Sequence, residues 1–312
     1  MIERKTITTR EAWLDWRRQD VTASNVGALF NCHPYVTPLR LYAEKSGTEF
    51  LVEDNLAMRR GRWLEPAVAK AVEEMRPEWK LEAATEYLRD PDLKIGATPD
   101  FYIKGDPRGL GVLQAKSVAP SVYAREWNDG KEVPLWIILQ AVQEAMLAEA
   151  DFVVIAALLV DAHNMEVAIH DIGPRNLMAE EKIKSAVKEF WRCVDAGIEP
   201  DPDYARDADT VKALWRAERD PAAEVDLSGN NRIPELLAER SILKSDIGAM
   251  NARLEEIDTE IKFEMKDAAI ATGIEGWRVT YKTSQVKEYT VKAREQRVLR
   301  VMDHREKTNA KI

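Results

Sequence analysis

Hydrophobic and polar residues follow two different patterns in the first part of this chain. In residues 55–75 the apolar positions recur at spacings of four, four and three, which places them on one face of a helix. Residues 97–103, 110–118 and 152–160 are apolar runs or alternate with a period of two, and they predict strands. We therefore expect residues 1–200 to form a mixed α/β domain.

Prolines, glycines and capping residues delimit further elements of this domain. Thr22 or Ser24 is suited to cap a second helix, and Pro38 is suited to begin a third helix that Gly47 ends. The other expected elements are a first helix with Trp13 and Trp16, a strand over 80–88, a helix over 134–150, a strand over 164–171 and a helix from Pro174 to Ala196.

The C-terminal part has a different pattern. Residues 201–230 are rich in Asp, Gly and Pro, and they predict a linker with one short helix near 211–217. Residues 231–312 are expected to form a helical arm with a small β tail, in which Gly273 and Gly276 end the helix and residues 278–292 make a hairpin. The arm carries a heptad seam, which favours either a helical hairpin or a contact between subunits. The seam consists of Leu243, Ile247, Met250, Leu254, Ile257 and Ile261.

Charge and composition exclude several classes of protein. The 45 Lys and Arg against 54 Asp and Glu give a net charge of -9, so the chain does not bind nucleic acid through overall basicity. A local basic groove stays compatible with that balance. The two cysteines, Cys32 and Cys193, are too few for a disulfide framework or a Cys-rich zinc site. No apolar segment has the length of a signal peptide or a membrane span, so we expect a cytoplasmic protein without membrane contact.

Three polar residues near two adjacent strands predict chemistry on phosphodiesters. Gln114 and Lys116 are two positions apart on one strand and share a face, and Asp100, which Pro99 holds at the end of the neighbouring strand, can reach that face. Oxygen ligands suit Mg²⁺, and a lysine beside them can position a water or stabilise developing negative charge. Alone this pattern is weak, because many hairpins contain an acid and a lysine.

Further motifs precede and follow these residues along the sequence. They are Trp13 to Arg18 with Val21-Thr22-Ala23-Ser24, then Gly61 to Glu65, Thr98-Pro99-Asp100, Gln114-Ala115-Lys116 and Gln140 to Gln143. Together they resemble the PD-(D/E)XK nuclease superfamily, and within it the lambda-exonuclease/YqaJ family of phage recombination exonucleases. The resemblance implies a restriction-endonuclease-like core, in which a central mixed β-sheet is flanked by helices. The C-terminal helical and β extension lies outside this core.

The resemblance also implies the composition of a metal site. Asp100 would be the principal ligand of Mg²⁺, for which Mn²⁺ would substitute. Gln114, the carbonyl of Ala115 and Glu65 would complete the site. Lys116 would orient or activate the attacking water.

Other residues would support this chemistry or hold DNA. Gln140 would support the lysine and the water, and Arg17 with Ser24 would hold the phosphate of a DNA 5′ end. Arg18 and Arg62 are further candidates for contact with DNA, although each is equally compatible with a solvated charge on a helix.

Gln114 departs from the family pattern, which has an acidic residue at this position. A glutamine offers a carbonyl oxygen without charge, so it should weaken metal binding and water activation. Two interpretations stay open. Either Glu65 and Asp100 supply enough charge for a natural glutamine, or an acid was replaced deliberately to leave DNA uncut; we slightly favour a site that is weakened or engineered.

The resulting hypothesis is a metal-dependent exonuclease that degrades one strand of double-stranded DNA from its ends, 5′ to 3′, and leaves 3′ single strands for recombination. The resemblance implies a homo-oligomer, a trimeric ring in relatives, with a single-strand annealing or recombinase protein as partner in the bacterial host of a phage or prophage. A non-catalytic DNA-end-binding module, a structure-specific endonuclease and a coiled-coil scaffold are the alternatives.

Overall fold

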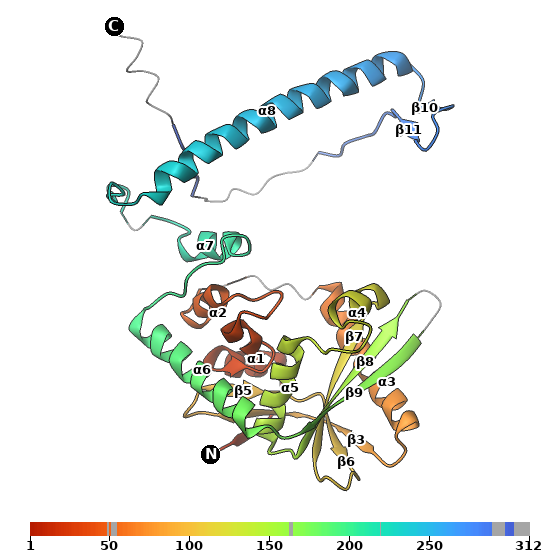
Figure 1. Cartoon of the computed structure of the whole chain (residues 1–312), viewed down its shortest axis with the longest axis vertical. Helices are drawn as coiled ribbons and strands as arrows, with labels where there is room; N and C mark the ends of the chain where they lie inside the picture. Colours follow the sequence, from red (N-terminus) through yellow and green to blue (C-terminus); the bar gives the residue numbers. More distant parts are fainter. Residues whose placement is uncertain (49, 51–54, 162–164, 219, 289–296, 303–312) are drawn as a thin grey trace. The chain divides into compact units, whose positions relative to one another are not determined.

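The computed structural model describes every residue except 49, 51–54, 162–164, 219, 289–296 and 303–312. The chain divides into two compact units, Met1–Trp215 and Arg216–Ile312, which are considered separately (Figure 1). Residue 164, the first of the expected strand over 164–171, lies outside the described residues.

A five-stranded mixed sheet forms the centre of the first unit. Its strands lie in the order β3 (Lys80–Ala83), β6 (Phe101–Lys104), β7 (Gly111–Val118), β8 (Phe152–Val160) and β9 (Met165–Pro174). β7 and β8 pair in parallel, and the other pairs of this sheet are antiparallel. The expected mixed α/β fold is thereby confirmed.

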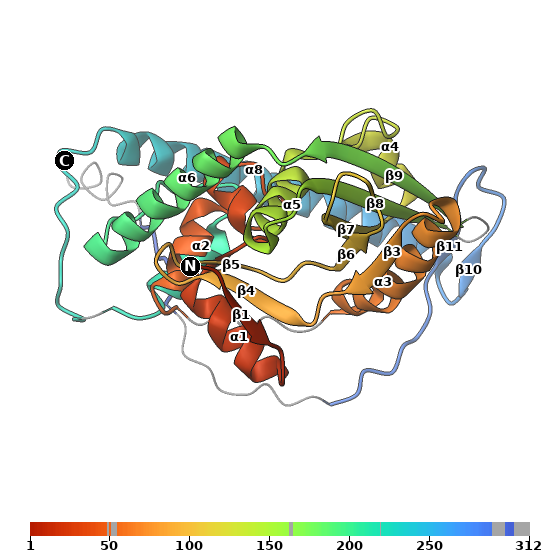
Figure 2. The same ribbon diagram turned by 90° about the horizontal axis from the view of Figure 1, so that it is seen from below.

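Helices connect the parallel strands and cover both faces of the sheet. A parallel pair requires a crossover, and here α4 (Pro120–Glu126) and α5 (Leu135–Ala148) supply it. On one face α5 packs against every second residue of β8, such as Ile155. On the other face α3 (Leu56–Met75) packs against the alternate residues, such as Val154 (Figure 2). Because both faces are buried, β8 is an almost continuous apolar run.

A second, four-stranded sheet positions the N-terminal motif. Its order is β1 (Glu3–Thr6), β4 (Glu86–Asp90), β5 (Ile95–Ala97) and β2 (Val21–Thr22). The remaining helices of the first unit are α1 (Arg10–Gln19), the 3₁₀ helix η1 (Val26–Phe30), α2 (Pro38–Lys45), α6 (Leu177–Ala196) and α7 (Ala208–Leu214).

Two expected elements near the N-terminal motif are wrong. The segment after Asp20 is not an α-helix, because Val21 and Thr22 pair in parallel with Ile95 and Gly96 of β5. The helix that follows is a 3₁₀ helix, and neither Thr22 nor Ser24 caps it. The expected strand over 80–88 is two strands of different sheets, which are separated at residues 84–85.

Three smaller boundaries also differ. The expected strand over 97–103 is divided by Pro99 between β5 and β6, which lie in different sheets. Pro174 ends β9, and α6 begins at Leu177 after Asn176, whose side-chain oxygen accepts from the Ala179 amide. Met75, the last of the apolar positions whose spacing over 55–75 predicted one helix face, is 53% exposed.

Part of the expected linker packs onto the first unit. The buried carboxylate of Asp207 accepts a hydrogen bond from the Thr37 hydroxyl, and Arg206 donates to the His33 carbonyl over 2.7 Å. Asp207, one of the acids of the expected linker, is therefore buried against the first unit. The short helix of this segment is α7, which begins earlier than expected.

The second unit consists mainly of α8 (Arg232–Met265). The expected helix is present, and the six seam residues are all exposed, between 38% and 64%. The helix ends at Lys266, which adopts positive φ, and not at the two glycines. The small hairpin pairs β10 (Ile270–Ala271) with β11 (Val279–Thr280), so only its second strand lies within the expected segment 278–292, whose last residues, 289–292, fall outside the described residues. In the described part of the chain no helix is long and apolar enough to cross a membrane.

Candidate functional site

The Asp100, Gln114 and Lys116 side chains meet beside α5. Asp100 directly precedes β6, whose first residue pairs with Leu113 of β7. The period of two along β7 turns Leu113 and Ala115 toward the core beneath α3, and turns Gln114 to the other face. Gln114 is 2% exposed, so its amide requires partners inside the protein.

One hydrogen-bonded chain joins these residues to α5. The Gln114 Nε2 and the Ala115 amide both donate to Oδ2 of Asp100, the latter over 2.8 Å. Nε2 of Gln140 donates to Oε1 of Gln114 over 2.9 Å, and Oε1 of Gln140 accepts from Nζ of Lys116 over 3.0 Å. The structure thus brings together four predicted site side chains, from the start of β6, from β7 and from α5.

Glu65 adds a second acid from α3. Burial raises the pKa of Glu65, and the charges of Lys116 and Arg62 oppose that rise. Burial raises the pKa of Asp100 to about 6, while Lys116 lowers it and the charge of Glu65 raises it further. Lys116 therefore interacts electrostatically with the carboxylates of both Glu65 and Asp100, and its positive charge offsets part of their negative charge.

Glu144 is a residue of this site that sequence reasoning missed. It lies one helical turn after Gln140 and is 1% exposed. Its Oε1 accepts from the Gln140 amide over 2.9 Å, and its Oε2 is a buried atom without a hydrogen-bond partner among the described residues. Burial, followed by the charge of Asp100, raises its pKa well above the ordinary value. The available signal was an acid four residues after Gln140 on an otherwise buried helix.

A cationic group lies at the junction of α1 and β2. Nη2 of Arg17 donates to Oγ of Ser24 over 2.8 Å, and its guanidinium lies 4.4 Å from the ring centre of Trp13. The indole of Trp13 donates to Oγ1 of Thr98 over 3.0 Å, which ties α1 to the loop before Asp100. Arg17 and Ser24 thus lie in direct contact.

Lys45 is a second cation beside Arg17 that the motifs did not indicate. Its side chain is 1% exposed, and its Nζ donates to the Arg17 carbonyl over 2.7 Å. Burial lowers the pKa of both cations. Two partly desolvated positive groups so close together favour an anion nearby.

The other two DNA-binding candidates lie at the surface. Arg18 is exposed and forms an ion pair with Asp15 over 2.7 Å, so it does not belong to the cationic group at the junction of α1 and β2. Arg62 is exposed on α3, three residues before Glu65, whose pKa its charge lowers. Their contact with DNA stays a prediction.

The donor atoms fit a hard divalent cation. Such ions prefer carboxylate and carbonyl oxygens, and the network offers the Asp100 carboxylate, the Ala115 carbonyl and the orphaned Oε2 of Glu144. Gln114 turns its amide nitrogen toward Asp100, so it must rotate its amide to present an oxygen there. No group of three His, Cys, Asp or Glu is already gathered as a metal cage in the described part of the chain. The fit therefore rests on a mixture of carboxylates and neutral carbonyls.

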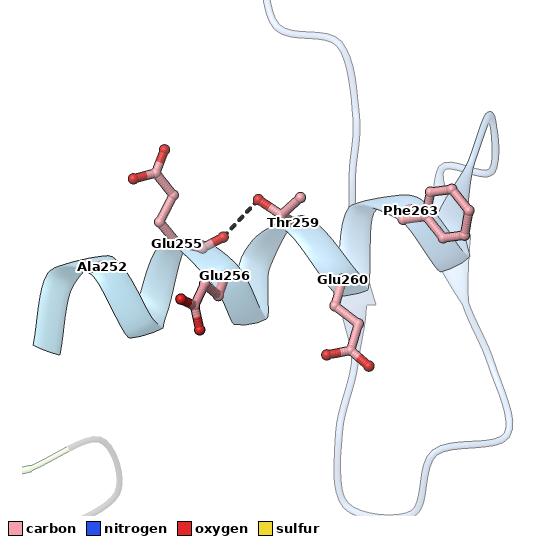
Figure 3. Close-up of a pocket in the computed structure, with 6 residues that line it drawn as sticks. All are labelled: Ala252, Glu255, Glu256, Thr259, Glu260 and Phe263. Atoms are coloured by element: carbon pink, nitrogen blue, oxygen red, sulfur yellow. Dashed lines mark hydrogen bonds between the residues drawn. The ribbon is translucent and has the colours of Figure 1, made fainter. Parts of the chain in front are cut away.

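A hollow on α8 has no comparable arrangement. It is lined by Ala252, Glu255, Glu256, Thr259, Glu260 and Phe263, which all belong to one helix (Figure 3). Figure 3 shows the carboxylates spread along the helix, with the Thr259 hydroxyl donating to the Glu255 carbonyl. The charged side chains on this surface do not point toward a common position.

Comparison with known proteins agrees with the order of motifs. Residues 12–151 match the YqaJ-like viral recombinase domain family. The match makes this segment similar to that family over somewhat less than half of the chain. The segment contains Arg17, Glu65, Asp100, Lys116 and the glutamines of α5. The expected resemblance to YqaJ-type proteins is thereby confirmed.

One curated relative matches a longer stretch than residues 12–151. The uncharacterized protein YqaJ of Bacillus subtilis (strain 168) is 26% identical over 264 residues, which are 83% of this chain and 79% of that protein. Since 264 residues exceed the 215 of the first unit, the likeness continues into the second unit.

Solved structures of exonucleases are also similar. LHK-Exo in complex with dAMP has a TM-score of 0.46 and 20% identity, covering 65% of this chain and 98% of that one. The alkaline exonuclease LHK-Exo from Laribacter hongkongensis has a TM-score of 0.46 and 20% identity, with coverages of 60% and 94%. A phage related exonuclease from Haemophilus somnus 129PT has a TM-score of 0.43 and 13% identity, with coverages of 58% and 96%.

Proposed function

We propose that the first unit is a metal-dependent deoxyribonuclease that acts on the ends of double-stranded DNA. The observation that carries the proposal is the bonded network of Asp100, Gln114, Lys116 and Gln140 inside a YqaJ-like domain. Degradation proceeds 5′ to 3′ along one strand and leaves a 3′ single strand, as the family resemblance implies.

The acids and carbonyls hold a divalent cation, with Mg²⁺ as the expected ion and Mn²⁺ as a substitute. Asp100, the Ala115 carbonyl and Gln114 are the expected ligands, and Glu65 assists directly or through water. When bound, the cation polarises the scissile phosphate and activates a water. Asp100 is the ligand whose direction the protein fixes most firmly, because two donors from β7 hold its carboxylate.

Lys116 orients the attacking water or stabilises the charge that develops on the phosphate. Gln140 fixes the position of its ammonium group through the 3.0 Å hydrogen bond. A lysine that is held by a neutral amide keeps its full charge available to the substrate, and none of the ion pairs among the described residues includes Lys116. Gln140 is therefore a positioning residue.

Arg17 and Ser24 hold the 5′ phosphate of the DNA end. The 2.8 Å bond between them shows that both side chains reach one point, and the Trp13–Thr98 bond fixes that point relative to Asp100. An arginine presents several donors in a fixed fork, which suits the oxygens of a terminal phosphate. Arg62 extends the same interaction along α3.

Gln114 makes this site less charged than the family pattern implies. Its amide already donates to Asp100, an arrangement that a glutamate could not adopt. This observation supports a non-catalytic DNA-end-binding module as the second candidate function. Both candidates require binding of ends, and only the nuclease requires cleavage.

The test uses a 5′-phosphorylated linear duplex that carries a fluorophore on either strand terminus, beside a closed circular duplex. With Mg²⁺ the proposal predicts loss of mononucleotides from each 5′ end, a persistent 3′ single strand and intact circles. Cutting of the circles would replace the exonuclease with the endonuclease alternative. Tight binding of ends without any cleavage, in Mg²⁺ and in Mn²⁺, would establish the binding module instead.

We also propose that the protein works as an oligomer, with a trimeric ring as the expected form. The six exposed seam residues of α8 support this, because a heptad seam in water gains stability when a second helix covers it. A protein that anneals the exposed 3′ strand is the expected functional partner, and the cytoplasm of a bacterial host is the expected location.

A further inference from the structure

The buried carboxylate of Glu144 has no role in the function proposed so far. It lies on α5 at 1% exposure, and its Oε2 has no hydrogen-bond partner among the described residues. Its neighbours along the helix are buried as well, among them Ala141 and Ala145. A buried acid of this kind costs stability, and an apolar residue or a glutamine would avoid most of that cost.

No ion pair explains the acid either. Salt bridges of the described residues do not include Glu144, although the positive charges of Lys116 and Arg17 act on it. Its one direct partner is the neutral amide of Gln140. The carboxyl group is therefore held in place without an ion-pair partner among the described residues, and it faces the same network as Asp100.

The network places Glu144 beside Gln114, the position at which the family pattern has an acid. Nε2 of Gln140 lies 2.9 Å from Oε1 of Gln114 and 2.9 Å from Oε1 of Glu144. Two oxygens that share one amide nitrogen must lie close to each other. The acidic group that the family pattern has on the strand is thus absent from β7, and an acid lies on α5, one side chain away.

We propose that Glu144 supplies the second negative charge of the cation site, in place of the acid that Gln114 lacks. The inference rests on the proposed function, and it assigns the chain a metal-binding residue outside the strand motif. Gln140 holds the carboxylate toward Asp100, and the free Oε2 faces the cation directly or through a water. The site then needs no engineered explanation for its glutamine, because an acid from α5 takes the role of the acid on the strand.

The test measures Mn²⁺ binding by the full chain without DNA, using the paramagnetic signal of free Mn²⁺ at fixed pH. Glu144→Gln keeps the shape and removes the charge, and it should weaken Mn²⁺ affinity about 10- to 100-fold. Gln114→Glu in the same chain should restore affinity to within a few-fold of the parent, because it returns the charge through the strand. Thermal unfolding of each variant in chelator checks that the fold is retained.

Asp100→Asn separates failure of this inference from failure of the proposed function. If Asp100→Asn abolishes Mn²⁺ binding while Glu144→Gln leaves it unchanged, the cation site stands and Glu144 is a structural acid. If the double variant binds as weakly as Glu144→Gln alone, the exchange of charge is wrong. If neither Asp100→Asn nor Glu144→Gln changes binding, the cation site itself is wrong.

Discussion

The first unit buries polar side chains, whereas the second unit exposes apolar ones. Gln114, Gln140 and Glu144 are each under 10% exposed, while Leu254 and Met250 of α8 are 58% and 64% exposed. Each arrangement costs free energy in an isolated chain, in the first case through desolvation and in the second through exposed apolar surface. Buried polar groups and exposed apolar surfaces of this kind mark positions where binding of a ligand or a partner offsets the unfavourable free energy.

The buried polar network and the exposed apolar seam differ in the kind of partner that each requires. Most polar atoms of the network in the first unit have hydrogen-bond partners within the protein. Oε2 of Glu144 is one of the buried atoms without such a partner among the described residues. The seam of α8 has no internal cover among the described residues of its unit. A small ion suffices for the first unit, whereas the second requires a surface as long as the helix.

The largest expected effect is that of Lys116→Ala. Loss of the ammonium removes stabilisation of developing charge, so cleavage of linear duplex should fall at least about 100-fold while binding of ends is largely kept. Lys104→Ala is the matched control, since Lys104 lies on β6 and pairs with Glu82 at the surface. Single-turnover digestion and a binding titration measure the two effects, and unchanged cleavage would remove Lys116 from the mechanism.

Arg17→Ala should have the next largest effect. Without the guanidinium, the preference for a 5′-phosphorylated end over a 5′-hydroxyl end should fall about tenfold, because a charge-assisted bond is lost. Arg18→Ala is the control from the same helix, and its exposed pairing with Asp15 predicts a much smaller change. Equal effects of both substitutions would contradict the assignment of the phosphate to Arg17 and Ser24.

The corresponding change in the second unit is Leu254→Glu. A charge in the middle of the seam should dissociate the oligomer and lower its mass two- to threefold at micromolar concentration, as measured by light scattering. Ala252→Glu adds the same charge to an exposed position away from the seam. A mass that stays constant in Leu254→Glu would show that α8 does not join subunits.

The smallest expected effect concerns the pH dependence of stability without metal. The pKa of Asp100 is raised to about 6 from its ordinary value near 4, so the folded state binds this proton more tightly than the unfolded state. The stabilisation is present below about pH 4 and is lost as pH rises through about 6. Asp100→Asn should therefore gain a few degrees in Tm relative to the parent between pH 4 and pH 7 in chelator. A constant difference in Tm would contradict the raised pKa.

The strand motif was predictable because it depends on local spacing. Gln114 and Lys116 share a face through the period of two, and Asp100 is fixed beside them by a short hairpin, so their proximity follows from the sequence. The sheet itself was predictable from apolar runs such as β8 for the same reason.

The errors arose where distant pairing decides the structure. Val21 and Thr22 form a strand only because β5 lies beside them, about 70 residues later in the chain. The break between β3 and β4 follows from their membership in different sheets, which no local pattern shows. Glu144 was missed because its importance depends on Gln140 and Gln114, whose contact crosses from strand to helix.

The most direct measurement is metal-dependent release of nucleotides from a 5′-phosphorylated linear duplex by the parent chain and by Asp100→Asn. A nuclease centred on Asp100 releases nucleotides when Mg²⁺ or Mn²⁺ is added, and loses this release in the variant while both proteins keep the same Tm in chelator to within a few degrees. Release that is equal in the two proteins, or absent from the parent with either ion, would contradict the account.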